Sequence, residues 1–266
     1  MILVTGASGF VGGKIMQIYK DVIACPSLRE ASADTIKRII EENEIDTIIH
    51  TAAISDIGVC QANPEASYIA NVQIPIYLAK AAKNAKLICF SSDQVYGGLD
   101  EEGPYSEDTV KPNNIYAEHK LEMEKAVLDI VPDAVMLRAE WMYDYYLKKP
   151  NYFMNILNAK EAVSFSSKQY RGITYVKEVA ENMEKVIKLP GGIYNFGSET
   201  TKSMKEITKE FLELTGKNIK LEEALPRHNL WMNCDKIKKH GVFFQSVESG
   251  LKACWEDYNE LGNKIV

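Results

Sequence analysis

The sequence predicts an α/β protein whose core is a doubly wound parallel sheet of the Rossmann type, with a smaller C-terminal substrate-binding lobe. Short apolar runs alternate with helical patterns over residues 1–140, which is typical of parallel strands covered by helices on both faces. A glycine-rich turn joins the first apolar run to the first helical pattern. The regular alternation weakens after Trp141, where the lobe is expected to begin.

The individual elements follow from the periodicity of apolar residues and from the positions of Gly and Pro. Strands are expected at residues 1–5, 22–25, 46–54, 87–92, 134–137 and 192–196. Helices are expected from the glycine turn to residue 19, at 33–43, from 63 to about 85 with a kink or break at Pro75, at 115–130 and at 176–187. The polar stretch 97–114 is expected to form a loop over the site.

These elements suggest two units. Residues 1–140 are expected to form a domain that binds NAD(P), to which residues 172–196 return. Residues 141–171 and 197–266 are expected to form the smaller lobe, which would bind the substrate.

The turn Gly6-x-x-Gly9-x-x-Gly12 predicts a dinucleotide site. Glycines allow a tight turn and a close approach of the backbone to a pyrophosphate, and the following helix points its N-terminus at the phosphates. A glycine-rich turn can be no more than a turn, but its place between a first strand and a first helix favours the site. The expected contacts of this turn are Gly6, Ser8, Gly9, Phe10, Val11 and Gly12.

The loop after the second strand indicates which cofactor binds. Proteins that prefer NAD place an acidic residue there for the ribose hydroxyls, whereas the 2′-phosphate of NADP favours hydroxyl and cationic groups. Here Ser27 and Arg29 follow the strand, so NADP(H) is expected to be preferred; the adjacent Glu30 leaves NAD(H) open. Three residues at the ends of later strands are also expected to contact the cofactor: Ala52, Ala53 and Ser91.

A tyrosine and a lysine on the helix at 115–130 predict proton transfer. Tyr116 and Lys120 are four residues apart and lie on one helix face, where the ammonium group would lower the tyrosine pKa and hold the cofactor ribose. Alone, such a pair is more often an ordinary amphipathic surface pair. Ser92 changes that balance, because it ends a predicted parallel strand, where ligands gather and where a hydroxyl can bond a substrate carbonyl. The expected catalytic residues are Ser92, Tyr116 and Lys120.

With these three features in this order, the chain resembles the extended short-chain dehydrogenase/reductase superfamily. Five stretches look like the dTDP-4-dehydrorhamnose reductase family: the R-x-x-W-x-Y segment at 138–143, the strand end at 92–96, the N-x-Y helix start at 114–116, the late strand at 192–195, and Asn229 with residues 234–237 near the C-terminus. The resemblance extends over nearly the whole chain. It implies an NADP(H)-dependent oxidoreductase that reduces a 4-keto nucleotide sugar, with substrate contacts at Ser92, Asp93, Trp141 and Arg171.

The chain also departs from that family's pattern. Residues 55–61 are closer to the broader epimerase and dehydratase pattern, and Ala139 and Glu140 replace the usual hydroxyl residues before Trp141. Two alternatives therefore stay open: an NAD-dependent nucleotide-sugar epimerase or dehydratase, and a non-catalytic NAD(P)-binding regulatory subunit. Asn71 is a candidate for a structural or water-holding asparagine. Gln169 and Arg227 are candidate sugar or diphosphate contacts, for which an ordinary surface position is an equal explanation.

Composition excludes several other functions. The net charge of −6 argues against binding nucleic acid, which needs a clustered basic face. The five cysteines and four histidines lack the spacing of a redox pair or a metal site, so no metal is expected. The chain opens without a leader-like segment and has no long apolar run, so a cytoplasmic protein without membrane contact is expected. The sequence is compatible with a homodimer but does not decide the oligomeric state.

Overall fold

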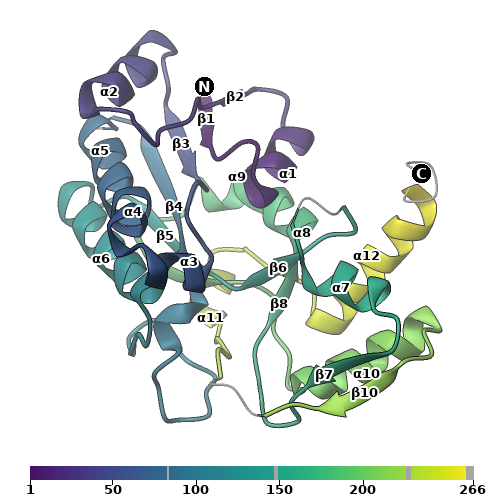
Figure 1. The fold of residues 1–266 in the computed structure, drawn as a ribbon. Coiled ribbons are helices and arrows are strands. Elements are labelled where there is room, and N and C mark those ends of the chain that lie inside the picture. Colours follow the sequence, from purple (N-terminus) through teal and green to yellow (C-terminus); the bar gives the residue numbers. More distant parts are fainter. Residues whose placement is uncertain (83, 147–148, 226–228, 262–266) are drawn as a thin grey trace.

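The computed structural model describes residues 1–82, 84–146, 149–225 and 229–261. At its centre is a six-stranded sheet in the order β2-β1-β3-β4-β5-β9 (Figure 1), in which every neighbouring pair is parallel. Its strands are β1 (Ile2–Thr5), β2 (Val22–Ala24), β3 (Thr47–His50), β4 (Lys86–Ser92), β5 (Val135–Ala139) and β9 (Gly192–Phe196). The predicted doubly wound α/β fold is confirmed.

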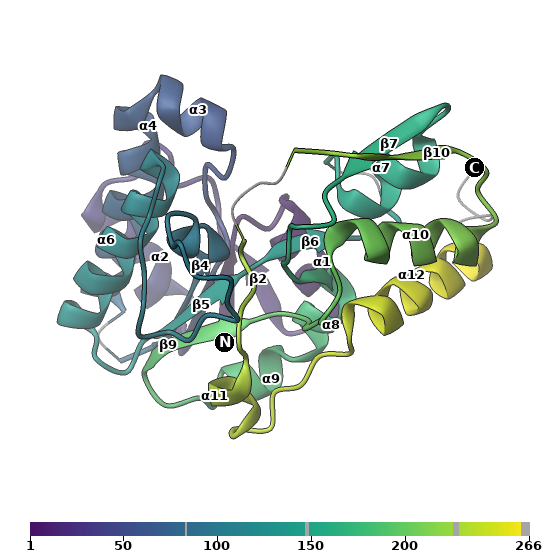
Figure 2. The same ribbon diagram turned by 90° about the horizontal axis from the view of Figure 1, so that it is seen from below.

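Helices cover both faces of this sheet (Figures 1 and 2). One face carries α2 (Ala33–Glu42), α5 (Ile74–Ala81) and α6 (Ile115–Ile130). The other carries α1 (Phe10–Ile18), α8 (Val176–Glu181), α9 (Met183–Val186) and α11 (Asp235–Lys238). Neighbouring strand residues alternate between the two cores, as Leu3 and Val4 do on β1, because side chains alternate across a strand.

The lobe has its own core. Its two small sheets pair β6 (Trp141–Tyr143) with β8 (Ile173–Tyr175), and β7 (Ala162–Phe165) with β10 (Lys220–Glu223). Its helices are α7 (Tyr152–Asn158), α10 (Met204–Thr215) and α12 (Val247–Leu261). Figure 2 shows α10 and α12 packed alongside each other, and an aromatic cluster that includes Phe153 and Phe211 fills the space between these elements.

The sheet order fixes where a ligand can bind. From β1 the chain passes through α1 to β2 on one side, and then through α2 to β3 on the other side of β1. Such a switch point opens a crevice at the carboxyl ends of the two central strands, where doubly wound proteins bind their ligands. The same edge of the sheet receives the end of β4, which carries Ser92.

Two local differences from the sequence expectations have physical reasons. The helix expected from residue 63 to about 85 is divided into α4 (Pro64–Tyr68), a π-helical turn η1 (Ile69–Gln73) and α5, so the break precedes Pro75 instead of lying at it. Proline lacks an N–H but is tolerated in the first turn of a helix, which is its place in α5. The strand expected at 46–54 pairs only over β3, because its partner β1 ends at Thr5.

The expected return of residues 172–196 to the sheet also has two parts. The strand expected at 192–196 is β9, which lies beside β5 in the central sheet. β8, in contrast, pairs with β6 outside that sheet. From the segment assigned to the lobe, Leu230, Met232 and Ile237 pack into the core of the central sheet. The division into two domains stays a prediction. Within the described residues, no helix is long and apolar enough to span a membrane.

Candidate active site

The glycine turn is shaped by close backbone contacts. Gly6 has a φ of +67°, in the left-handed region, and a Cβ there would lie 2.8 Å from the Ala52 nitrogen at the end of β3. A Cβ on Gly12 would lie 2.3 Å from the Gly6 carbonyl oxygen, and one on Gly9 would lie 3.0 Å from it. The turn therefore needs all three glycines, and it holds the N-terminus of α1 at the crevice, an arrangement that fits a pyrophosphate.

The remaining residues predicted to bind cofactor surround this crevice. Ser8 is exposed in the turn, and Ala53 is exposed just beyond β3. Ser27 and Arg29 are exposed in the loop that follows β2, the neighbour of β1. These positions leave their side chains accessible to a ligand that lies across the ends of β1 and β2.

Tyr116 and Lys120 come together on the first turns of α6. Asn114 caps this helix by accepting a hydrogen bond of 2.9 Å from the Ala117 N–H. Tyr116 and Lys120 are 7% and 2% exposed, and the Lys120 Nζ lies 5.7 Å from the centroid of the tyrosine ring. The same Nζ donates a hydrogen bond of 2.8 Å to the Phe90 carbonyl oxygen, which ties the helix to β4. The expected pairing of phenol and ammonium on one face is present.

Burial controls the ionisation of both groups. It lowers the pKa of Lys120 to about 8, because a charged ammonium is costly away from water. It raises the pKa of Tyr116 well above its usual range, an effect that the nearby Asp93 carboxylate reinforces and the Ser92 hydroxyl opposes by hydrogen bonding. In the protein without cofactor, burial therefore outweighs the lowering expected from Lys120. The phenol keeps its proton at neutral pH, the state that a proton donor requires.

Ser92 connects Tyr116 to a charged pair. Its hydroxyl donates a hydrogen bond of 3.2 Å to Asp93, which in turn accepts from Arg171 at 2.6 Å. The Arg171 guanidinium also lies 5.7 Å from the centre of the Trp141 ring. Three residues predicted to bind substrate are thus in direct contact, although they come from the end of β4, from β6 and from the loop before β8. Arg227 lies outside the described residues.

A buried ion pair that was missing from the sequence predictions joins α6 to β5 next to the site residues. Arg138 on β5 donates from Nε and from Nη2 to the Glu124 carboxylate at 3.0 and 2.8 Å. The Ser91 hydroxyl donates to the same carboxylate at 2.5 Å. The proton of the Ser91 hydroxyl is therefore engaged within the protein, and the hydroxyl oxygen can only accept a further hydrogen bond. Glu124 stands four residues after Lys120 on α6, but its partner Arg138 lies on β5, so spacing within the helix does not reveal the pair.

Asn71 is a second anchor. It lies fully buried in the π-helical turn η1. Its side chain accepts a hydrogen bond of 3.1 Å from the Ile54 N–H and donates one of 2.9 Å to the Ile54 carbonyl oxygen. Of the two roles left open for Asn71, these bonds show the structural one, because they fix the segment that leaves β3 beside the site.

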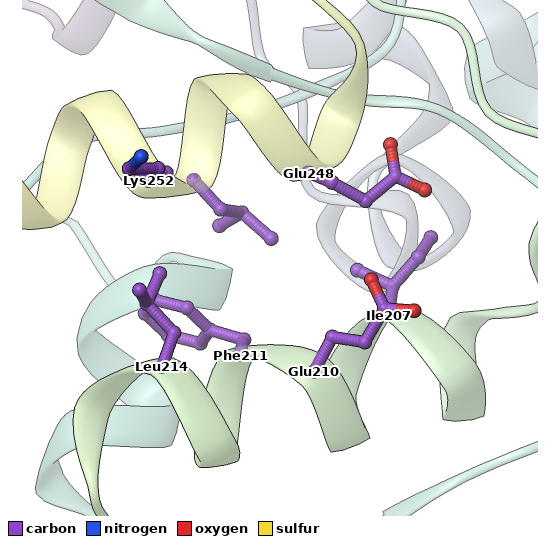
Figure 3. Close-up of a pocket in the computed structure, with 7 residues that line it drawn as sticks. Ile207, Glu210, Phe211, Leu214, Glu248 and Lys252 are labelled. Carbon is purple, nitrogen blue, oxygen red and sulfur yellow. The ribbon is translucent and has the colours of Figure 1, made fainter.

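The site that these residues form does not include the pocket that the structure shows in the lobe. Figure 3 shows that pocket, a groove of about 180 Å³ between α10 and α12. It is lined by Ile207, Glu210, Phe211, Leu214, Glu248, Leu251 and Lys252, none of which is a predicted site residue. Among the described residues, no group of three or more Cys, His, Asp or Glu side chains is placed to hold a metal ion.

Comparison with known proteins accounts for this arrangement of sheet, glycine turn and Tyr–Lys helix. The model of the RmlD substrate binding domain family matches residues 1–236, which include all of these features. The chain belongs to this family. The resemblance to the dTDP-4-dehydrorhamnose reductases is thereby confirmed at the level of the family.

The relatives of this chain differ in name, as two curated proteins and one solved structure illustrate. The chain is 31% identical to methionine adenosyltransferase 2 subunit beta from Xenopus tropicalis, over 90% of its own length and 82% of the relative. It is 34% identical to dTDP-4-dehydrorhamnose reductase from Mycolicibacterium smegmatis, over 53% of its own length and 46% of the relative. Its fold matches that of the dTDP-4-dehydrorhamnose reductase from Bacillus anthracis in complex with NADP, with a TM-score of 0.86 and 20% identity over 96% of this chain and 98% of that one.

Proposed function

We propose that this chain is an NADPH-dependent reductase of a nucleotide-linked 4-keto sugar. The observation that carries the proposal is the convergence of Ser92, Tyr116 and Lys120 at the carboxyl end of β4, on the same edge of the sheet as the glycine turn. Membership of the RmlD substrate binding domain family and the named reductase relatives support the same activity. The chain thus has both halves of a reductase site: a cradle for the cofactor and a proton donor for the substrate.

The residues of the triad have different roles in this reaction. When bound, the reduced nicotinamide supplies a hydride to the carbonyl carbon. Tyr116 gives its phenolic proton to the carbonyl oxygen, which becomes the new hydroxyl group, while Ser92 donates a hydrogen bond to the same oxygen. Lys120 is placed to hold the cofactor ribose and to stabilise the tyrosinate that remains. We assign the sugar to the Asp93, Arg171 and Trp141 side of the triad, where an indole face can pack against a hexose.

The cofactor preference follows from the loop after β2. Ser27 and Arg29 are exposed there, and a 2′-phosphate would find a hydroxyl and a guanidinium group within one loop. We therefore propose NADPH over NADH as the preferred cofactor. The complex of the Bacillus anthracis reductase contains NADP, which agrees with this choice.

A screen of 4-keto sugar nucleotides tests the activity. Purified protein is mixed with NADPH and dTDP-4-dehydrorhamnose, and then with 4-keto sugars on other nucleotides, and the loss of reduced-nicotinamide absorbance is followed. Turnover that Tyr116→Phe abolishes is the expected result. One relative is named as a subunit of methionine adenosyltransferase, so the absence of turnover would also be informative. A protein that binds NADPH tightly but reduces none of these sugars would overturn the reductase proposal and favour a non-catalytic subunit.

A further inference from the structure

Glu140 is a buried carboxyl group at the edge of the sheet where the candidate site lies. It follows Ala139, the last residue of β5, which is paired with Ser92 on β4. Asp93 follows Ser92 and Gly197 follows the end of β9, the other neighbour of β5. The three strands thus deliver Asp93, Glu140 and Gly197 to one edge, and two of these residues are acids.

The backbone around Glu140 is shaped to hold a large side chain. A Cβ on Gly172 would lie 2.1 Å from the Glu140 Oε2, and a Cβ on Gly197 would lie 2.4 Å from its Cδ. Neither position could carry a side chain without displacing the carboxyl group. The two glycines and Glu140 therefore form a matched set.

The two carboxyl oxygens of Glu140 have different surroundings. Oε1 accepts hydrogen bonds from the Thr174 Oγ1 at 2.5 Å and from the Ser198 N–H at 2.9 Å. No residue in the described part of the chain makes a hydrogen bond to Oε2. Beside it, the Ser198 Oγ and the Arg171 Nε are buried atoms without a hydrogen-bond partner among the described residues. Since buried polar groups are nearly always paired, unpaired ones beside a candidate site indicate where a ligand bonds.

Glu140 is also poised to carry its proton. Burial raises the pKa of its carboxyl to about 8, the Asp93 carboxylate raises it further and the Arg171 guanidinium lowers it. The other titratable groups that sense this carboxyl are Cys234 and Tyr143, both neutral at this pH. Near neutral pH the group is therefore a carboxylic acid, which can both donate and accept a hydrogen bond.

We propose that Glu140 is a specificity-determining residue of the sugar site, whose free Oε2 makes a hydrogen bond to a hydroxyl group of the hexose beside Asp93 and Trp141. This inference rests on the proposed function, because it places the hexose of a nucleotide sugar at this edge. A purely structural Glu140 would only join the end of β5 to Thr174 and Ser198. If Glu140 binds the sugar, replacing it should reduce the affinity that the sugar adds to the nucleotide. If Glu140 is purely structural, that added affinity should not change selectively.

The test measures that contribution directly. The affinities of dTDP-glucose and of dTDP are measured by titration calorimetry on the protein saturated with NADP⁺, and their ratio gives the gain from the sugar. Glu140→Gln keeps a donor and an acceptor in the same shape, so it should preserve the ratio. Glu140→Leu, and Glu140→Ser where the leucine variant does not fold, should lower the ratio about 10-fold, with dTDP binding unchanged. Glu178→Gln alters a buried acid of α8 away from the site and is the matched control.

Three results would overturn the inference. An unchanged ratio in Glu140→Leu or Glu140→Ser shows that Oε2 does not contact the sugar. Equal losses of dTDP and dTDP-glucose affinity, with a lower melting temperature, show a structural residue. Wild-type protein that binds neither these two ligands nor the glucose and free forms of the other nucleoside diphosphates overturns the proposed nucleotide-sugar function itself, and the role of Glu140 falls with it. The second and third outcomes are therefore distinguishable.

Discussion

Tyr116 shows how a residue's environment selects its role. Its phenol is buried, lies beside the Asp93 carboxylate and keeps its proton. We expect Tyr116→Phe to lower kcat by about 10²–10⁴-fold, the range that general acid catalysis contributes. NADPH affinity and melting temperature should stay close to wild type, because the ring remains. Steady-state kinetics with a verified keto-sugar substrate, and fluorescence titration with NADPH, check both parts. Turnover at the wild-type rate would rule Tyr116 out as the acid.

Arg138 and Glu124 are a buried pair whose members depend on each other. Each side chain is 3% exposed, and the pair is joined at 2.8 Å. Removing one partner leaves the other charge buried and uncompensated, so Arg138→Leu should lower the free energy of unfolding by about 3–5 kcal/mol. The double variant Arg138→Leu with Glu124→Leu should recover part of that loss. Urea unfolding of the single and double variants measures the coupling. Additive losses would contradict it.

Glu140 should make stability depend on pH. Its pKa in the folded protein is about 8, above the ordinary value of 4.5, so between these values the folded protein holds a proton that the unfolded chain releases. The unfolded state binds fewer protons there, and stability falls as pH rises through this window. Glu140→Gln removes the effect.

The melting temperature of wild type relative to Glu140→Gln should therefore fall from pH 5 to pH 8. One pKa unit is worth about 1.4 kcal/mol, or roughly 2–4 °C in a chain of this size. Differential scanning calorimetry at the two pH values checks the sign. Parallel curves for the two proteins would show that Glu140 is ionised when folded.

At the scale of an element, the turn between β1 and α1 is fixed by contacts that leave no room for a methyl group. A Cβ on Gly12 would lie only 2.3 Å from the Gly6 carbonyl oxygen. Because that oxygen belongs to the backbone, the clash can be relieved only by moving the turn itself. Gly12→Ala should therefore weaken NADPH binding at least 10-fold and lower the melting temperature. Gly58→Ala is the control, because its new methyl would meet only the Oδ1 of the capping Asp56 side chain, at 3.2 Å, on exposed α3 (Ile57–Ala62). Equal effects in both variants would count against the turn as the cofactor cradle.

Most elements of the sheet could be predicted from the sequence because each carries a local signal. The helix expected at 115–130 and the strand expected at 192–196 are present with those bounds, since a capping Asn114 and an apolar strand run mark them. The π-helical turn before Pro75 carried no such signal. The pairing of β8 with β6 is a contact between distant segments, and periodicity within one segment does not reveal which partner it has.

The candidate site divides in the same way. Ser92, Tyr116 and Lys120 could be found because their spacing and their places on a strand end and a helix are local features. Glu124 and Glu140 act through tertiary contacts, one with Arg138 and one with Thr174 and Ser198. The sequence showed Glu140 only as a departure from a family pattern. Its burial and its unpaired oxygen depend on glycines that lie 32 and 57 residues further along the chain.

At the scale of the whole molecule, the proposed site spans two ends that belong to different parts of the chain. Arg29 lies in the loop after β2, at the end proposed for the cofactor, whereas Arg171 reaches from the loop before β8 to Asp93, at the end proposed for the sugar. A hydrogen bond to a charged group contributes about 1.5–3 kcal/mol, or roughly 10–100-fold in affinity. A variant at one end should therefore lose affinity for the ligand at that end by a measurable factor and keep its affinity for the other ligand.

Arg29→Ala should reduce the preference for NADPH over NADH by about that factor and leave the KM of the sugar nucleotide nearly unchanged. Arg171→Ala should raise the KM of the sugar nucleotide and leave the cofactor preference nearly unchanged. It leaves Asp93 without its partner and removes a cation from the sugar side, but it does not alter the turn around Gly6. Initial rates of both variants, measured with each cofactor at several concentrations of sugar nucleotide, give the cofactor preference and the KM of the sugar for each variant. If Arg171→Ala changed cofactor preference, or Arg29→Ala raised the KM of the sugar, the assignment of the two ends of the site would be wrong.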